Sequence, residues 1–210
     1  MKQLMSILSL LCLFSISLSA FEYKNGDLIF QAQGTSNFSD AIATATGMTD
    51  SLTYVHVGIV FKDNSQNINV IEASTEKGVR ILPVDSFINL SPKYHGKPYL
   101  TLKRVNKELP VEQIIENAMK FLGQPYDWYY MPDNGMIYCS ELVYESYLDI
   151  HGNKIFQAKP MNFRAPDGTM PDFWIELYKK LGVEVPEGIP GTNPNDLSND
   201  PQLIEVYRFF

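Results

Sequence analysis

The pattern of apolar positions predicts several strands in the first half of the chain. Residues 53–61 form the clearest strand, because Val55, Val57, Ile59 and Phe61 recur at every second position, as in a strand with one buried face. Similar apolar runs bounded by turn residues predict further strands at 26–32, 68–74, 78–84 and 99–105, and a last edge strand at 203–209.

Helical spacing begins after these strands. Pro110 suits the first turn of a helix, apolar residues follow at helical intervals from Val111 to Leu122, and Gly123 and Pro125 end the pattern. Further helices are predicted at 38–47, from Cys139 onward and at 171–182. Because strands and helices are grouped in sequence, we predict an α+β fold with a mostly antiparallel sheet.

Two further expectations concern the second half of the chain. In the helix that starts near Cys139, one face is expected to carry Cys139, Leu142, Val143, Ser146, Tyr147 and Ile150. The segment 183–201 is rich in Pro, Gly, Asn and Asp, so we predict an irregular surface segment there.

The first 20 residues resemble a signal peptide, because Lys2 is followed by an apolar run and then by small residues up to Ala20. The run is short for a membrane span, although an uncleaved anchor is the alternative. Cys12 follows two leucines rather than the small residue that a lipoprotein site needs. We expect cleavage after Ser19 or Ala20, which leaves a single domain over 21–210 and no membrane insertion.

The net charge and the cysteine content bear on the partners and the location of the protein. The full chain of 210 residues carries a net charge of −7 and two cysteines. Loss of residues 1–20 removes Lys2 and Cys12, which leaves a charge of −8 and Cys139 as the remaining thiol. An acidic chain is a poor binder of phosphate backbones, so we expect no nucleic-acid partner. The expected location is exported, either periplasmic or extracellular.

Two residues on neighbouring predicted strands suggest a catalytic pair. His56 shares a face of its strand with Tyr54 and Gly58, and the glycine would leave the backbone beside the imidazole open to a ligand. A hairpin centred on Asn64 places His56 opposite Glu72, within side-chain contact. A slip of two residues would make the pair diagonal, and a slip of one would separate their faces.

Cys139 could complete such a site, because it lies in the first turn of a predicted helix. That position and a nearby imidazolium favour the thiolate, and the first-turn N–H groups can stabilise an oxyanion. A carboxylate such as Glu72 beside His56 would fix the imidazole tautomer and favour its protonated form. Nucleophile, base and orienting acid are the parts of a catalytic triad.

Other interpretations of these residues stay open. Cys139 alone could be a small buried hydrophobic residue or could pair with another chain, and Cys139, His56 and Glu72 together could bind zinc. However, His95 and His151 lie in loop-like segments, and neither a C-x-x-C nor an H-E-x-x-H motif occurs. We therefore expect no metal and no cofactor.

Several motifs together resemble a known family. "GDLIF", "YVHVGIV" and "VIEAS", and "GQPYDW" followed by "YCSELVYESY", are similar to motifs of the NlpC-type peptidases, papain-like cysteine hydrolases of bacterial cell walls. In that family the cysteine helix usually precedes the strands, whereas here it follows them. This order resembles the circularly permuted YiiX/YebB-like branch, which is related to the lecithin retinol acyltransferase-like proteins. The resemblance covers residues 25–150.

The resemblance implies a permuted papain-like fold, with the cysteine helix packed on the sheet, and a thiol hydrolase. Cys139 matches the nucleophile, His56 the general base and Glu72 the orienting residue, and the intermediate would be a thioester acyl-enzyme. The expected substrate is a peptide-like amide, with cell-wall peptides among the candidates, or another small acyl-containing molecule. Alternatives are an acyltransferase or esterase acting on lipid acyl groups, and a catalytically weak binding module. The oligomeric state is not indicated.

Five further residues are candidates for roles around the nucleophile. Tyr126 matches a family tyrosine near the oxyanion position, with simple aromatic packing as the alternative. Ser140 and Tyr54 are further candidates for binding the oxyanion or the substrate. We expect Asp127 to be structural, with its carboxylate on loop N–H groups. Glu141 stands in "YCSE" where the family usually has "DCSG", and a charge there would disfavour the thiolate.

Overall fold

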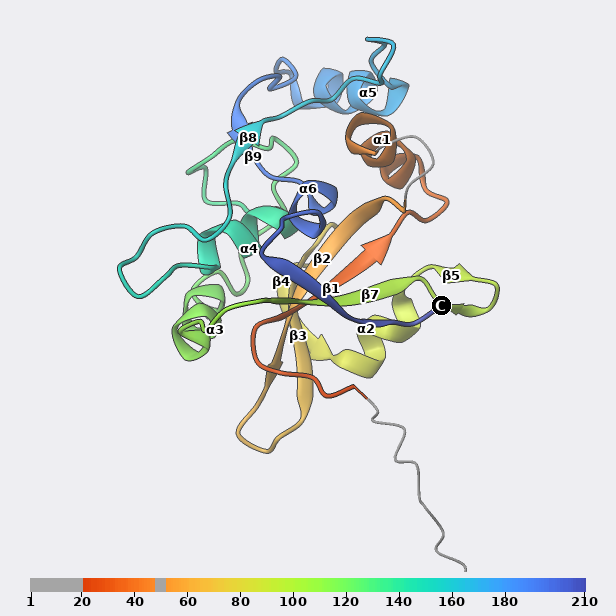
Figure 1. Cartoon of the computed structure of the whole chain (residues 1–210). Coiled ribbons are helices and arrows are strands. Elements are labelled where there is room, and N and C mark those ends of the chain that lie inside the picture. Colours follow the sequence, from red (N-terminus) through yellow and green to blue (C-terminus); the bar gives the residue numbers. More distant parts are fainter. Residues whose placement is uncertain (1–20, 48–51) are drawn as a thin grey trace, which may run out of the picture.

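A six-stranded antiparallel sheet forms the centre of the molecule, as the computed structural model of residues 21–47 and 52–210 shows. The strand order is β10-β7-β1-β2-β3-β4 (Figure 1). The predicted signal peptide, including Cys12, lies outside the described residues. The strands are β1 (Asp27–Ala32), β2 (Tyr54–Lys62), β3 (Ile68–Ser74), β4 (Gly78–Pro83), β7 (Leu100–Val105) and β10 (Leu203–Arg208).

Helices and short two-stranded ribbons surround this sheet. The helices are α1 (Asn37–Thr46), α2 (Val84–Leu90), α3 (Val111–Met119), α4 (Cys139–Ser146), α5 (Asp172–Leu181) and α6 (Pro194–Ser198). The short ribbons pair β5 (Lys93–Tyr94) with β6 (Lys97–Pro98), and β8 (Lys159–Pro160) with β9 (Pro190–Gly191). No helix among the described residues is long and apolar enough to span a bilayer.

The predicted α+β class with an antiparallel sheet is confirmed, and so are the six strands and four of the helices. The sequence pattern did not indicate α2 or α6. The prediction of an irregular surface segment at 183–201 is wrong in part, because α6 lies there and buries Leu197 and Ser198. Asn193 starts this helix by accepting the N–H of Asp196, so part of the polar composition belongs to a helix cap.

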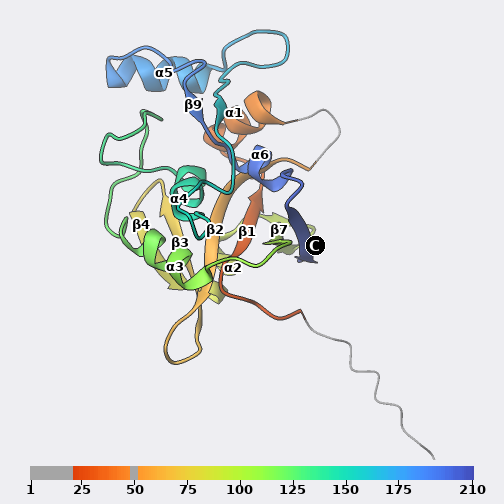
Figure 2. The same ribbon diagram turned by 60° about the vertical axis from the view of Figure 1, so that its left-hand side comes forward.

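The sheet has a hydrophobic cluster on each face. The larger cluster includes Phe30, Val57 and Ile71 of the sheet together with Leu142 of α4. The smaller includes Val60 and Val70 together with Phe87 of α2. Figure 2 shows α4 and α2 on different sides of the sheet. α1 and α5 lie next to each other beyond one end of the strands (Figure 1).

An irregularity in the pairing of β1 with β2 decides which side chains share a face. Gln31 pairs with His56 but Ala32 pairs with Tyr54, so Val55 is an extra residue in β2, as in a β-bulge. Tyr54 therefore joins the larger cluster together with Val57. The prediction that Tyr54 shares the face of His56 is wrong, because strict alternation breaks at the bulge.

Helix α4 begins at Cys139 and is fixed at both ends. The Glu141 carboxyl group accepts the N–H of Tyr138 at 3.3 Å through Oε2, which is half of a capping box. At the other end the Tyr147 hydroxyl donates to the Gly26 carbonyl at 2.7 Å, just before β1. Ile150 lies beyond the helix and is exposed, so its predicted place on the buried face is wrong.

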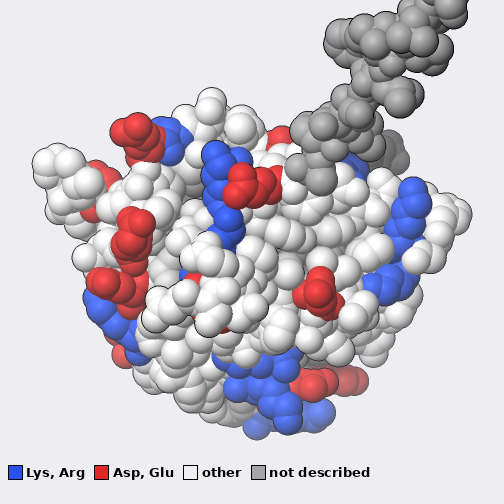
Figure 3. Space-filling model, turned by 90° about the horizontal axis from the view of Figure 1, so that it is seen from below, with Lys and Arg blue, Asp and Glu red and all other residues white. Residues whose placement is uncertain are grey.

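Charged side chains of both signs are interspersed among uncharged ones on the face shown in Figure 3, where described residues are visible. Ion pairs of the described residues include Lys62 with Glu22 and Arg208 with Glu205. Exposed pairs of this kind contribute little to stability. The net negative charge is thus not gathered into one acidic surface on this face.

The cap residue Glu141 gives a prediction about stability and pH. Burial, and secondarily the nearby Asp127, Glu145 and Asp133, raise its pKa to about 8, against the lowering effect of the Tyr138 N–H. The unfolded chain loses this proton near pH 4.5 and the folded chain near 8, so stability falls as the pH rises between those values. Glu141→Gln should therefore gain stability relative to wild type as the pH rises from 4.5 to 8.

Urea unfolding at pH 4.5, 6 and 8 measures this difference, with Glu112→Gln in the first turn of α3 as the control. A stability difference between Glu141→Gln and wild type that is constant over this range would contradict the buried, protonated carboxyl.

Candidate active site

The structure brings the three sequence-predicted residues His56, Glu72 and Cys139 together. His56 Nε2 lies 2.5 Å from Glu72 Oε2, and the Cys139 side chain is close enough to the same imidazole to raise its pKa. Because Nε2 is engaged with the carboxylate, Nδ1 is the ring nitrogen left for the sulfur. The imidazole thus bridges a thiol and a carboxylate, as in a Cys-His-acid triad.

The strand register differs from the prediction by two residues. Ile59 pairs with Ile71 rather than with Asn69, so Glu72 falls opposite Gly58 in the same register and is diagonal to His56. A shift of two residues keeps both side chains on one face, and a diagonal pair is within reach of long side chains. The contact therefore forms although the predicted pairing of His56 with Glu72 is wrong.

Electrostatics in this group favour a protonated imidazole. Burial opposes the charge on His56, but the hydrogen bonds to Cys139 and Glu72 and the negative charges they carry raise its pKa to about 10. Burial likewise opposes the charge on Glu72, yet His56 and Arg80 lower the pKa of this carboxyl. At neutral pH the site therefore holds an imidazolium between two acceptors.

Arg80 is a candidate functional residue that the sequence analysis missed. It pairs with Glu72 across β3 and β4, and its Nε and Nη2 lie 2.8 and 2.7 Å from Glu72 Oε1. Arg80 therefore occupies one carboxylate oxygen while His56 takes the other. The signal was present in the sequence, because the hairpin turn at 75–77 puts residues 72 and 80 opposite each other.

Phe87 of α2 is a second residue that was missed, and it covers the imidazole. Its ring stacks on His56 with a centroid distance of 5.9 Å and an interplanar angle of 19°. The expected opening beside Gly58 is not there, because a Cβ on this glycine would lie 2.4 Å from Val70 Cγ1 and 3.5 Å from Phe87. Gly58 thus allows close packing behind the histidine rather than ligand access.

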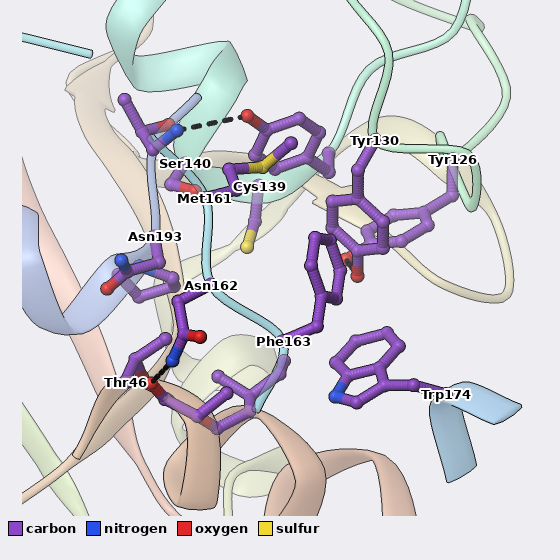
Figure 4. A pocket seen from close by; sticks show the side chains of 15 residues that line it. Thr46, Tyr126, Tyr130, Cys139, Ser140, Met161, Asn162, Phe163, Trp174 and Asn193 are labelled. Atoms are coloured by element: carbon purple, nitrogen blue, oxygen red, sulfur yellow. Dashed lines mark hydrogen bonds between the residues drawn. The ribbon is translucent and has the colours of Figure 1, made fainter. Parts of the chain in front are cut away.

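Cys139 faces a narrow cavity with mostly apolar walls, which we call the apolar slot. The thiol is free, and the residue is 3% exposed. Figure 4 shows its sulfur pointing into the space between Tyr130, Phe163 and Asn193. The slot measures about 50 Å³. Its walls include Tyr126, Tyr130, Met161, Phe163, Trp174 and Thr192.

A wider space lies on the histidine side and is here called the polar cleft. It measures about 480 Å³, and its lining includes His56, Glu72, Glu76, Arg80 and Phe87. The slot reaches the sulfur and the cleft reaches the imidazole, so the Cys139–His56 pair lies between two spaces of different chemistry. Segments 33–53, 85–98 and 124–138 contribute to these linings, and so do residues of 161–163, 174 and 192–194 from the second half of the chain.

The three other candidate residues have different places. Tyr126 and Ser140 line the slot beside Cys139, and the Tyr126 hydroxyl lies 3.3 Å from that of Tyr130. Tyr54 lines neither the slot nor the cleft; its hydroxyl contacts Thr101 Oγ1 at 2.7 Å inside the core. The structure thus keeps Tyr126 and Ser140 near the thiol and gives Tyr54 a packing role.

Asp127 shapes the loop that carries the slot tyrosines. Its buried carboxylate accepts the N–H groups of Tyr129 at 2.8 Å and Met131 at 2.9 Å. Between them Tyr130 has a φ of 53°, a left-handed conformation that is uncommon for a residue other than glycine. The expected structural role of Asp127 is confirmed, and it places the Tyr130 ring in the slot wall.

Comparison with known proteins gives relatives over nearly the whole chain. The uncharacterized protein YiiX of Escherichia coli K12 is 30% identical over 212 aligned residues, which cover 99% of this chain and 96% of the relative. A crystal structure described as that of the metalloprotein yiiX from Escherichia coli O157:H7 matches with a TM-score of 0.70 and 27% identity, over 89% of this chain and 98% of that one.

The word metalloprotein in that description raises the question of a metal in this chain. Among the described residues no group of three or more His, Cys, Asp or Glu side chains is arranged to hold an ion. In the triad Glu72 already binds Arg80 and His56, and the guanidinium would repel a cation there. The residues of this site therefore do not fit a metal.

The model of a protein family described as "Permuted papain-like amidase enzyme, YaeF/YiiX, C92 family" matches residues 22–207. The match spans both the strands and the later cysteine helix, so the resemblance inferred from the motif order is confirmed. The chain belongs to the YaeF/YiiX family of permuted papain-like amidases.

Proposed function

We propose that this protein hydrolyses a peptide-like amide through Cys139, His56 and Glu72. The observation that carries the proposal is the imidazole of His56, held between the Cys139 thiol and the Glu72 carboxylate. Membership of an amidase family supports a hydrolase at the level of the family. An intact triad also argues against a binding module that has lost turnover.

The geometry supports a two-step reaction with a covalent intermediate. The Cys139 thiolate attacks the carbonyl carbon, and the oxyanion receives N–H groups from the first turn of α4, which a helix leaves unpaired. The His56 imidazolium gives its proton to the leaving amine, and a thioester remains on Cys139. A water molecule, deprotonated by His56, then attacks the thioester and releases the acid and the thiol.

The charges of the polar cleft favour an amine as the leaving group. Among its lining residues are the carboxylates Glu72 and Glu76 and the single guanidinium of Arg80. Arg80 is neutralised by Glu72, and His56 is uncharged once it has given its proton to the amine, so at that stage Glu76 leaves the cleft with a negative charge. An amine that departs past His56 becomes an ammonium ion in water, which this charge attracts. Amide hydrolysis produces such a group, whereas ester hydrolysis produces a neutral alcohol.

Acyl transfer or esterase activity on a lipid acyl group is the second candidate, and the mostly apolar wall of the slot favours it. We also propose that the protein acts outside the cytoplasm, where bacterial cell-wall peptides are available. The support is the signal-like sequence of residues 1–20. Fractionation of expressing cells with N-terminal sequencing tests the export.

The first prediction concerns the nucleophile. Iodoacetamide should alkylate Cys139 in the native protein at pH 7 faster than it alkylates free cysteine, because the imidazolium favours the thiolate. Cys139→Ser should abolish both labelling and hydrolysis of a panel of peptidyl, γ-glutamyl and fatty-acyl amides. Wild-type hydrolysis should decline as the pH rises through about 10, where His56 loses its proton.

Mass spectrometry of the labelled protein and pH-rate profiles provide the measurements. Failure of native Cys139 to react at all, while the urea-unfolded chain reacts, would remove it from the nucleophile role.

A second prediction concerns Arg80 as a positioning residue. Arg80→Met should lower kcat by about tenfold or more, because hydrogen bonds to charged groups contribute about 1.5–3 kcal/mol. KM should change little, since Arg80 acts through Glu72. Loss of the guanidinium also raises the pKa of Glu72, so the acidic limb of the pH-rate profile should move to higher pH.

Arg208→Met is the matched control, because Arg208 pairs with Glu205 on the exposed strand β10. An unchanged acidic limb in Arg80→Met, or an equal effect of both substitutions, would show that Arg80 has no specific role at the site.

A third prediction concerns metal ions. Hydrolysis should survive prolonged EDTA treatment and dialysis, because the triad side chains are occupied with one another. The thiol mechanism would be contradicted if EDTA abolished hydrolysis, if added zinc restored it, and if the Cys139→Ser variant still had this zinc-dependent activity.

A further inference from the structure

The apolar slot contains hydrogen-bonding groups without partners. Among the described residues, three buried side-chain N or O atoms have no hydrogen bond: Ser140 Oγ, Trp174 Nε1 and Thr192 Oγ1. All three residues line the slot. They are 0%, 2% and 8% exposed respectively. The unpaired groups are thus gathered in one place, next to the proposed nucleophile.

Such groups are costly, so their clustering points to a ligand. A buried donor or acceptor without a partner costs about 1–3 kcal/mol, and most buried polar atoms are paired. Trp174 Nε1 can only donate, so its partner must carry an acceptor. Figure 4 shows this nitrogen on the side of the indole that faces the slot. The hydroxyls of Ser140 and Thr192 can donate or accept.

The remaining features of the slot restrict the ligand further. Apart from Cys139, which is paired with His56, none of the described residues that line it is charged, so a charged group would enter without a counterion, which is unfavourable. A volume of about 50 Å³ corresponds to about four water molecules, at 10–15 Å³ for each. A long hydrocarbon chain is too large for this space and offers nothing to the indole N–H.

We propose that the slot binds a small uncharged amide group on the acyl side of the scissile bond, such as the acetamido group of an N-acetylated small residue. This inference rests on the proposed function, because the proposed hydrolysis defines which side of the scissile bond is the acyl side. The carbonyl of the amide accepts from Trp174 Nε1, its N–H donates to Ser140 or Thr192, and its methyl group packs on Tyr130 and Phe163. The substrate class is therefore a short neutral peptide segment rather than a lipid acyl chain.

The test uses the full mature chain with Cys139→Ala, so that binding is measured without turnover. The probes are N-acetyl-L-alanine methylamide and N,2-dimethylpentanamide, in which a propyl group replaces the acetamido group. The protein has two tryptophans, and Trp128, which does not line the slot, serves as the internal control. The measured signals are the indole ¹H–¹⁵N resonances, assigned with Trp128→Phe.

The acetamido probe should shift the Trp174 indole proton downfield in a saturable way and leave Trp128 nearly unchanged. It should bind about fivefold more tightly than its hydrocarbon analogue, the effect of about one hydrogen bond. Trp174→Phe keeps an aromatic ring but lacks the donor, and should remove this preference. The double variant Ser140→Ala/Thr192→Val removes both acceptors for the amide N–H, so it should weaken the acetamido probe selectively, and it provides a second test if Trp174→Phe does not fold.

Equal affinities, tighter binding of the hydrocarbon, or no Trp174 shift up to the solubility of the probe would overturn this inference. If the slot assignment is right and only the proposed function is wrong, the experiments give a different result. In that case the slot binds the acetamido probe as described, while wild-type protein cleaves no N-acetylalanyl amide.

Discussion

The candidate site depends on the contacts that the carboxylate of Glu72 makes with its two neighbours. Its side chain is 5% exposed and lies between two cationic groups, Arg80 on one oxygen and His56 on the other. A buried carboxylate without partners would be strongly unfavourable, so these contacts keep it charged. The charged form in turn holds His56 protonated and aimed at Cys139. Strands β3 and β4 therefore belong to the candidate site, because they present Arg80 opposite Glu72.

The triad could be predicted from sequence because its parts depend on short-range rules. His56 and Glu72 lie on adjacent strands with the same parity, and a register error of two residues preserved their common face. Cys139 was found from a helix start and from the family resemblance. Asp127 was placed correctly, since a carboxylate followed by loop N–H groups forms a local motif. Apart from the family resemblance, which linked Cys139 to His56, these inferences needed only neighbours in sequence or in one hairpin.

The parts that could not be predicted depend on long-range packing. The bulge at Val55 moved Tyr54 into the core, and alternation alone does not reveal a bulge. The slot wall combines Trp174 of α5 and Thr192 near β9 with Cys139, and no spacing rule links such distant segments. The segment 183–201 was mistaken for an irregular surface, because its polar residues include a helix cap and buried positions of α6.

The two sides of the Cys139–His56 pair differ in a way that a thiol hydrolase can use. The slot is narrow, neutral and largely apolar, whereas the cleft is roughly ten times larger by volume and carries carboxylates. An acyl group that stays attached to sulfur until water arrives benefits from a close-fitting, water-poor wall. A leaving amine benefits from a wide, wet and negatively charged exit. In the proposed reaction this asymmetry assigns a direction to the substrate across the pair, with the acyl part toward Trp174 and the amine toward Glu76.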